Sequence, residues 1–268
     1  MKLSISNIGW KAENDLKVYE IMKKYGYSGL EIAPTRIFPN KPYDQNEKAK
    51  IWSKEIKQKY ALDISSMQSI WYGCQECVFG TEEERMFLQE YTKKAIDFAA
   101  VIKCKNLVFG CPRNRNIFKD EDYKIGVSFF RELGDYAFKM GTVIGLEANP
   151  IIYHTNFIND TKSALEFIKV VNSKGFLLNL DIGTMIQNEE KPEELVDNVR
   201  YINHVHISEP NLKPLKERAL HKKIKAILSE ERYNGFISIE MGNIDELSIL
   251  EDKISYIKDI FGRTDLKK

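Results

Sequence analysis

Short apolar segments rich in β-branched residues alternate eight times with longer segments of helical period along the 268-residue chain. The predicted strands are residues 3–8, 29–33, 63–68, 106–110, 143–148, 176–181, 203–208 and 236–241. The predicted helices lie near residues 12–25, 44–60, 81–102, 120–140, 160–173, 192–199, 216–230 and 245–262. Such an alternation predicts a parallel sheet whose strands are connected by helices.

Eight strand and helix units fit the roughly 250 residues that are typical of the closed (β/α)8 barrel, or TIM barrel. An open doubly wound sheet agrees less well with the chain, because the glycine-rich phosphate-binding fingerprint of that fold is absent. No linker or low-complexity stretch divides the sequence, so we expect residues 1–268 to form a single TIM-barrel domain of the α/β class. In these barrels the chemistry takes place at the carboxyl ends of the strands.

Four polar residues stand at the predicted ends of strands 5 to 8. They are Glu147 in "TVIGLEANP", Asp181 in "LNLDIGT", His206 in "INHVHISEP" and Glu240 in "FISIEMGN". The steps between them are 34, 25 and 34 residues, each about one strand and one helix long. The two-residue repeat of a strand places the three acids on the same face as the inward residues before them. We therefore expect the four side chains to meet at the mouth of the barrel.

Three carboxylates at one barrel mouth repel one another unless a cation neutralises them. Carboxylates with one imidazole form an oxygen-rich ligand set that suits Mn²⁺ or Mg²⁺ and tolerates Co²⁺ or Zn²⁺. Alternatively, each acid caps a turn or pairs with a nearby lysine. The combination of ligand types and positions favours one divalent metal ion, with Mn²⁺ preferred.

The overall charge argues against a polyanionic partner. Forty basic and 39 acidic residues give a formal charge of +1, so no field attracts nucleic acid. The amino-terminal "MKLSISNIGW" lacks the unbroken apolar stretch of a signal peptide, and no window approaches 18 apolar residues. We expect a cytoplasmic protein that does not span or bind a membrane.

The four cysteines fit a reducing compartment in which thiols stay free. Cys74 and Cys77 form "CQEC", which could be half of a zinc site or a redox pair. No second pair follows at matching spacing, and the segment is not a turn from a strand into a helix. Incidental thiols are therefore the favoured interpretation.

The segments "GLEANP", "LNLDIGT", "HVHISEP" and "ISIEM", in this order, resemble those of the sugar isomerase and epimerase barrels. This xylose isomerase-like group includes ketose 3-epimerases, hydroxypyruvate isomerases and inosose dehydratases. "SISNIGW" and "GLEIAP" also fit, and the resemblance covers essentially the whole chain. It implies that Glu147, Asp181, His206 and Glu240 bind one divalent metal ion, with Glu147 and Glu240 also serving as acid and base. Many ketose epimerases have histidine where this chain has Thr184, which leaves the substrate contact at that position open.

A metal-bound carbonyl makes the neighbouring C–H group acidic by stabilising the resulting enediolate. Two carboxylates on opposite sides of the substrate support epimerisation, and a single carboxylate that does both jobs supports aldose–ketose isomerisation. We expect a sugar, a sugar phosphate or a related polyol ketone as the substrate. Alternatives are a dehydratase of a keto-inositol-type substrate and a catalytically silent barrel used as a binding module. An apurinic endonuclease is less consistent, because its multi-zinc site is rich in histidine and this chain has four histidines.

Other polar or aromatic residues near the strand ends are weaker candidates for substrate contacts. Those at the ends of strands 1 to 3 could bind sugar hydroxyls or hold their own loops, and the loop after strand 3 could form a lid or contact a second copy in a homo-oligomer. Arginines after strand 4 could bind a phosphate. The candidates are Asn7, Glu31, Gln68, Trp71, Arg113, Arg115, Thr184, Lys213 and His221. His204 is expected to lie one layer deeper than His206, as a buried residue with a supporting role.

Overall fold

The computed structural model describes residues 1–262, in which eight parallel strands close into a barrel in the order β1 to β8. The strands are β1 Lys2–Ser6, β2 Gly29–Ile32, β3 Asp63–Met67, β4 Leu107–Phe109, β5 Ile144–Leu146, β6 Phe176–Asp181, β7 Ile202–Ile207 and β8 Phe236–Ile239. Pairing of β1 with β8, in which Ile5 lies opposite Ile239, closes the ring. The predicted (β/α)8 barrel is confirmed.

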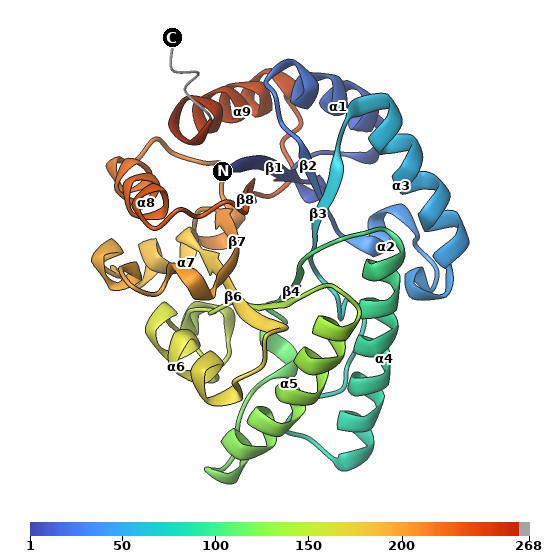
Figure 1. Ribbon diagram of the computed structural model, residues 1–268, viewed down its shortest axis with the longest axis vertical. Coiled ribbons are helices and arrows are strands. Elements are labelled where there is room, and N and C mark those ends of the chain that lie inside the picture. The colour runs from blue at the N-terminus through green and yellow to red at the C-terminus, as the bar shows by residue number, and fades with distance from the viewer. Residues whose placement is uncertain (263–268) are drawn as a thin grey trace.

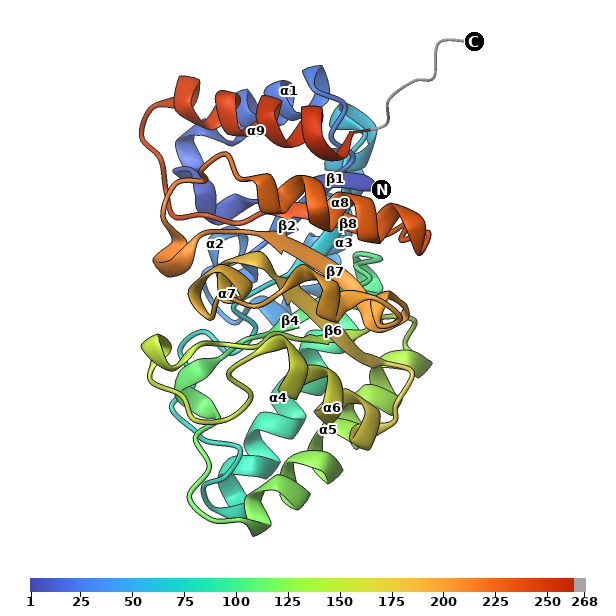
Figure 2. The same ribbon diagram turned by 90° about the vertical axis from the view of Figure 1, so that its left-hand side faces the viewer.

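Helices form an outer ring around the strands (Figures 1 and 2). They are α1 Asp15–Lys24, α2 Pro34–Ile37, α3 Asn46–Tyr60, α4 Glu82–Val101, α5 Glu121–Lys139, α6 Thr161–Val171, α7 Ile182–Gln187, α8 Ala219–Glu230 and α9 Leu247–Phe261. Apolar faces of these helices pack on the outward side chains of the strands and form the hydrophobic core. No helix in residues 1–262 has both the length and the apolar character that crossing a bilayer requires.

The helix predicted at residues 192–199 is wrong. The chain instead forms α7 immediately after β6, followed by two short 3-10 turns, Pro192–Leu195 and Val199–Tyr201. Asp181, the last residue of β6, starts α7 because its carboxylate accepts hydrogen bonds from the amides of Gly183 and Thr184. Asp197 has a φ of 65°, in the left-handed region, so one continuous helix cannot pass through it.

The interior of the barrel is polar beneath its mouth. Ser4 and Ser65 lie within hydrogen-bond distance, at 2.6 Å between their hydroxyl oxygens. The Asn106 amide donates to Ser66 at 2.9 Å and to Asn179 at 3.3 Å, and all of these side chains are buried. This polar layer makes it possible to bury ionisable side chains at the mouth above it, because its hydrogen-bonding groups replace the water that burial removes.

Candidate active site

Glu147, Asp181, His206 and Glu240 converge at the carboxyl ends of the strands, with one potential ligand atom from each lying within 4.8 Å of all the others. His206 Nδ1 lies 2.9 Å from Glu147 Oε1 and 3.2 Å from Glu240 Oε2. Asp181 ends β6 and His206 belongs to β7, whereas the two glutamates directly follow β5 and β8. The expected convergence at the barrel mouth is thus present in the structure.

Asp181 is held by the polypeptide around the start of α7. The amides of Gly183 and Thr184 donate to its carboxylate at 3.3 and 2.9 Å, and the Ser208 hydroxyl donates to the same carboxylate. The Thr184 hydroxyl lies 2.9 Å from Asp181 Oδ2. These contacts fix the carboxylate and leave it at the wall of the cavity that covers the four residues.

His206 is oriented from behind by Glu31, which is completely buried. Glu31 Oε2 lies 2.9 Å from His206 Nε2 and 3.0 Å from His204 Nε2. Donation from Nε2–H of His206 to Glu31 leaves Nδ1 directed at Glu147 and Glu240. His204 lies deeper in the barrel, as expected from its position two residues earlier on β7.

The Asn179 side chain connects two members of the cluster. Its amide nitrogen donates to Glu147 Oε1 at 2.9 Å and lies 3.2 Å from His206 Nδ1. Asn149 adds a longer contact of 3.4 Å to Glu147 Oε2. Because one amide group touches both the carboxylate and the imidazole, Asn179 fixes their relative position.

The excess of carboxylates in the cluster attracts positive charge. Burial raises the pKa of Glu147, Asp181 and Glu240, and the charge of a neighbouring carboxylate raises it further at each of them. At His206, burial alone would lower the pKa, but the charges of Glu240 and Glu31 and the bond to Glu147 together raise it well above its usual range. An uncompensated group of buried acids around one imidazole therefore favours a bound cation.

The donor set fits a divalent metal ion. Three carboxylates and one imidazole supply hard oxygen ligands and one nitrogen ligand from four separate strands. Gly110 keeps the space beside Glu147 open, since a Cβ atom there would lie 2.7 Å from Glu147 Oε2. A second group, Glu31, His204 and His206, is fully buried, and neither Glu31 nor His204 lines the cavity.

A cavity of about 700 Å³ opens above the cluster, and Glu147, Asp181 and Glu240 form part of its lining. This volume is ample for a monosaccharide and lies within the range of small-molecule sites. The aromatic side chains of Trp71 and Tyr153 contribute to its walls. The arrangement therefore provides a binding space directly over the proposed reactive groups.

Three of the weaker sequence candidates line this cavity, namely Gln68, Trp71 and Arg113. The Gln68 amide donates to Glu31 Oε1 at 3.2 Å, which ties it to the support behind His206. The Trp71 indole N–H donates to the hydroxyl of Thr92 at 2.8 Å, and the ring is buried. Trp71 is therefore a fixed part of the wall in this structure.

Three further candidates lie behind the lining of this cavity. Asn7 is completely buried and accepts a hydrogen bond from the Ala33 amide at 2.9 Å. Glu31 contacts the histidines, and Thr184 contacts Asp181, as described above. These side chains position other groups of the site, and the structure does not place them where a bound sugar would touch them.

Lys213 and His221 do not line the cavity either. Lys213 is exposed on the segment after β7. His221 is buried on α8, where Nδ1 lies 2.9 Å from the Tyr256 hydroxyl, and burial lowers its pKa to about 4. The sequence order after β7 placed these residues near the mouth, but α8 turns His221 toward α9.

Sequence reasoning missed several polar residues of the site. Asn149, Ser208 and Glu209 line the cavity, and Asn179 bridges two residues of the cluster. The signal for two of them was present, because Asn179 and Ser208 stand two residues from Asp181 and His206 and share their strand parity. The strand parity that marks the ionisable residues therefore also marks these two polar side chains.

All four cysteines are free thiols. Cys74 and Cys111 line the cavity, and burial raises the pKa of the two thiols to about 11 and about 12. Within the described residues, neither Cys74 nor Cys77 belongs to a candidate metal cluster. These features agree with the interpretation of "CQEC" as incidental thiols, although Cys74 stands beside the candidate site.

The fold and the site together place the chain in a class of proteins. These are TIM barrels with a cluster of acids and histidine at the carboxyl ends of the strands. Within this class, the chain belongs to the xylose isomerase-like TIM barrel family, whose family model matches residues 19–260. The resemblance stated from the sequence segments is thereby confirmed. No curated protein gives a significant match to the sequence.

Solved structures share the fold along almost the whole chain. The 3-keto-D-glucoside 4-epimerase from E. coli has a TM-score of 0.78 at 21% identity, over 97% of this chain and 99% of that one. D-psicose 3-epimerase, solved in the presence of D-fructose, has a TM-score of 0.77 at 16% identity, over 98% and 100%. A family 2 AP endonuclease from Brucella melitensis has a TM-score of 0.75 at 16% identity, over 97% and 99%. At such identities the likeness shows the fold alone.

The two arginines that follow β4 differ in position. Arg113 is exposed at the cavity, whereas Arg115 is completely buried, does not line it, and donates to the backbone carbonyls of Glu147 at 2.9 Å and Ile158 at 3.3 Å. Burial lowers the pKa of Arg115 to about 10. Arg115 therefore supports the backbone below Glu147, and the structure does not present it to a substrate phosphate.

This difference in position predicts unequal effects of the two arginines on stability. Arg115→Met should lower the free energy of unfolding by about 2 kcal/mol, because the buried carbonyl of Glu147 loses the Arg115 donor and the carbonyl of Ile158 keeps only the amide of Asn149. Arg113→Met, a matched change on the same loop, should alter it by less than about 0.5 kcal/mol. Urea denaturation of the two variants measures this difference, and equal effects would contradict the assigned position of Arg115.

Proposed function

We propose that the protein is a divalent-metal-dependent epimerase or isomerase of a sugar. The observation that carries the proposal is the convergence of Glu147, Asp181, His206 and Glu240, the three acids of which line a cavity large enough for a monosaccharide. Membership of the xylose isomerase-like family supports it, as do the similar folds of two sugar epimerases.

Glu147, Asp181, His206 and Glu240 would hold the ion through three carboxylates and the Nδ1 atom of the imidazole. When bound, the ion supplies positive charge that stabilises negative charge developing on a carbonyl oxygen of the substrate. Mn²⁺ is the preferred ion, since the ligand set is oxygen-rich with a single nitrogen. Glu31 keeps Nδ1 free for this role by accepting a hydrogen bond from the Nε2–H group of His206.

Glu147 and Glu240 are the proposed acid and base. They enter the mouth from the ends of two strands that are not neighbours, β5 and β8, and both contact His206 Nδ1. A substrate carbon held between them would have a carboxylate on each face. Burial raises the pKa of each carboxyl group, which makes the ionised form a stronger base toward a C–H group next to a carbonyl. One glutamate removes the proton and the other returns a proton to the opposite face.

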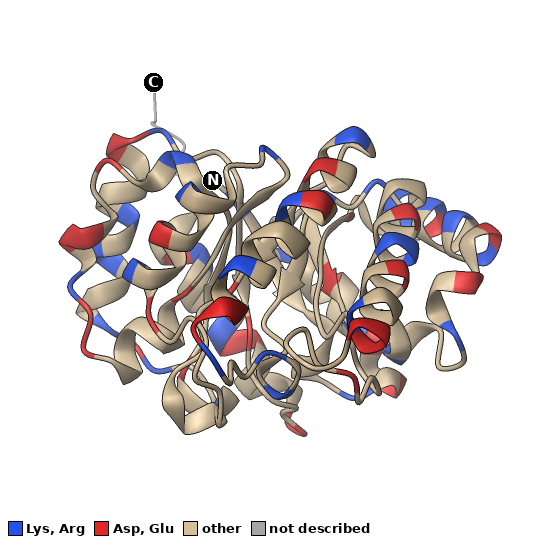
Figure 3. Cartoon of the chain, turned by 90° about the horizontal axis from the view of Figure 1, so that it is seen from below, with Lys and Arg blue, Asp and Glu red and all other residues tan. Residues whose placement is uncertain are grey.

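A nucleic-acid substrate is disfavoured, although an AP endonuclease has a similar fold. Acidic and basic residues are interspersed along the outer helices (Figure 3), and the formal charge is +1. Binding to a phosphate backbone requires a concentration of basic side chains. The four histidines of the chain also limit the nitrogen ligands, and His221 lies away from the mouth.

The direct test of the proposed function is incubation with Mn²⁺ and a panel of ketoses, sugar phosphates, keto-glycosides and keto-inositols in deuterated water. Proton abstraction next to a carbonyl should incorporate deuterium at one carbon of a sugar member of the panel, and the product should be an epimer or an isomer. Loss of water from a keto-inositol would instead identify a dehydratase. An absence of exchange in every compound would contradict the proposal.

Metal binding should depend on pH in a defined direction. The raised pKa values mean that His206, Glu147 and Glu240 keep their protons to higher pH than free side chains do, and metal ligation requires the deprotonated forms. Affinity for Mn²⁺ should therefore rise with pH, with release of protons. Calorimetric titration of the metal-free protein in buffers of different ionisation enthalpy measures this release.

Matched variants locate the metal ligands. His206→Ala should weaken Mn²⁺ binding by more than about 100-fold, because it removes a direct ligand. Glu209→Gln changes another acid of the cavity, one that pairs with Arg218 at 2.5 Å, and should retain tight binding. Equal affinity in the two variants would remove His206 from the proposed ligand set.

The roles of the two glutamates can be separated by isotope exchange. Glu147→Gln and Glu240→Gln keep an oxygen atom near the ion but remove the base, so kcat should fall by about 10²- to 10⁴-fold. In an epimerase, each variant should still exchange the substrate proton on the face served by its remaining carboxylate, without inverting the centre. In an isomerase, one variant should lose exchange altogether. Full exchange and turnover in both variants would show that neither glutamate is the base.

A further inference from the structure

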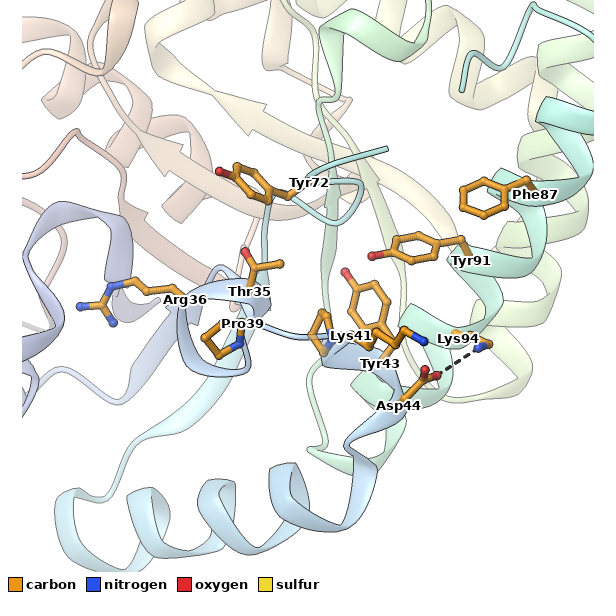
Figure 4. A pocket seen from close by; sticks show the side chains of 11 residues that line it. Thr35, Arg36, Pro39, Lys41, Tyr43, Asp44, Tyr72, Phe87, Tyr91 and Lys94 are labelled. Atoms are coloured by element: carbon orange, nitrogen blue, oxygen red, sulfur yellow. Dashed lines mark hydrogen bonds and ion pairs between the residues drawn. The ribbon is translucent and has the colours of Figure 1, made fainter. Parts of the chain in front are cut away.

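A second cavity, of about 740 Å³, lies beside the candidate active site between α2, the 3-10 turn Pro42–Asp44 and α4 (Figure 4). Its aromatic lining comes from three segments that are distant in sequence: Tyr43 from the turn, Tyr72 from the loop after β3, and Phe87 and Tyr91 from α4. No residue of the proposed metal cluster takes part in it.

The two cavities meet at Tyr72, which lines both of them. This side chain is 71% exposed, so it is not packed into the core. The loop that carries Tyr72 is held from below, because the Tyr43 hydroxyl donates to the carbonyl of Ile70 at 2.8 Å. A ligand that extends past Tyr72 would therefore pass from one cavity into the other.

The aromatic groups present flat apolar surface. Phe87 and Tyr91, one helical turn apart on α4, are stacked with ring centroids 5.9 Å apart and an angle of 14° between their planes. Tyr43 packs against Tyr91 at 5.2 Å, edge to face. Phe87 is 46% exposed although it is a large apolar residue, and it stands at this cavity. Exposed aromatic surface of this kind is typical of a binding site.

Hydrogen-bonding groups surround this aromatic surface. Asp44 and Lys94 form an exposed ion pair of 3.0 Å, and the side chains of Thr35 and Lys41 also line the cavity (Figure 4). Tyr91 adds a hydroxyl group to the same lining. Flat apolar surface edged by donors and acceptors matches a sugar ring, which has apolar C–H faces and a rim of hydroxyl groups.

Arg36 does not add a free charge to this surface. Its guanidinium is directed away from the cavity in Figure 4 and pairs with Asp15 at 2.7 Å. The remaining charged groups are one acid, Asp44, and two lysines, Lys41 and Lys94. The lining thus offers separate hydrogen-bond donors and acceptors, which suit hydroxyl groups. It lacks an arginine free to form the bidentate contact that a phosphate site commonly uses.

We propose that this second cavity binds the second ring of a two-ring glycoside, whose reacting ring lies over Glu147 and Glu240. The inference rests on the proposed function and narrows its substrate class from sugars in general to glycosides. It also constrains the chemistry. If the reacting ring is linked through its anomeric carbon, that carbon cannot be the free carbonyl, so the carbonyl must be a ketone at another ring carbon.

The test compares one-ring and two-ring ligands that share the same reacting ring. The probes are methyl 3-keto-glucoside and the corresponding 3-keto disaccharide, used with the Mn²⁺-loaded protein. Phe87→Ala should raise the KM of the disaccharide relative to that of the methyl glycoside by about tenfold, because it removes a stacking surface. Tyr91→Phe preserves the ring packing and should shift the same ratio in the same direction by a smaller factor.

Phe118→Ala is the matched control, since Phe118 is a 74% exposed phenylalanine that lines neither cavity. It should leave the ratio of the two KM values unchanged. If Phe87→Ala also leaves this ratio unchanged, the second-ring site is wrong while the proposed epimerase function stands. Dissociation of an oligomer by Phe87→Ala, with an unchanged ratio, would identify the cavity as a contact between copies instead.

A binding experiment separates this inference from a failure of the proposed function. Saturation-transfer NMR with maltose and methyl glucoside, on metal-free protein, reports contact of each ring without requiring turnover. The second ring of maltose should show contact in the wild type and in Phe118→Ala, and lose most of it in Phe87→Ala. Equal signals in all three proteins would overturn the second-ring site even if no probe is turned over.

Discussion

The structure depends on keeping three buried carboxylates beside one imidazole. Each acid is held on its own strand end, and the imidazole is fixed from the opposite side by Glu31. Negative charge concentrated in this way is costly in a protein interior unless a cation or hydrogen-bond donors compensate it. The polar barrel interior, with Asn179 at its top, provides such donors, and the same excess of negative charge makes the mouth selective for a cation.

The cavity above the cluster follows from the same geometry. The strand ends bring the reactive groups together. The loops that follow these strands form the cavity walls, and the walls differ in whether their side chains contact the cluster. After β5 and β6 the chain is tied closely to the cluster through Asn149, Thr184 and Ser208 of the neighbouring β7 end. After β2 and β3 the chain instead forms an aromatic surface around Tyr43 and Tyr72 that does not touch the cluster.

The sequence predicted the barrel and the four converging residues because both depend on period. A strand end recurs once per unit, and parity along the strand decides which side chain points inward. The periodicity of apolar residues does not predict where the side chains of the loops lie. Arg113 and Arg115 looked equivalent, yet the left-handed backbone at Cys111 and the 3-10 turn Pro112–Asn114 leave one exposed and the other buried. Glu31 was a candidate either for binding a sugar hydroxyl or for holding its own loop, and only the three-dimensional structure shows that two histidines lie against it.

Asp181 ends one strand, starts the next helix and contributes to the cluster, so its replacement alters backbone and chemistry together. Such overlap of roles restricts evolutionary change in this half of the barrel. The segments around Pro42–Asp44 and Tyr72 carry no comparable double role, and exchanges of side chains there leave the cluster intact. Divergence of ligand preference among descendants of this scaffold is therefore expected to accumulate in these two segments, while the cluster and Glu31 behind it stay constant.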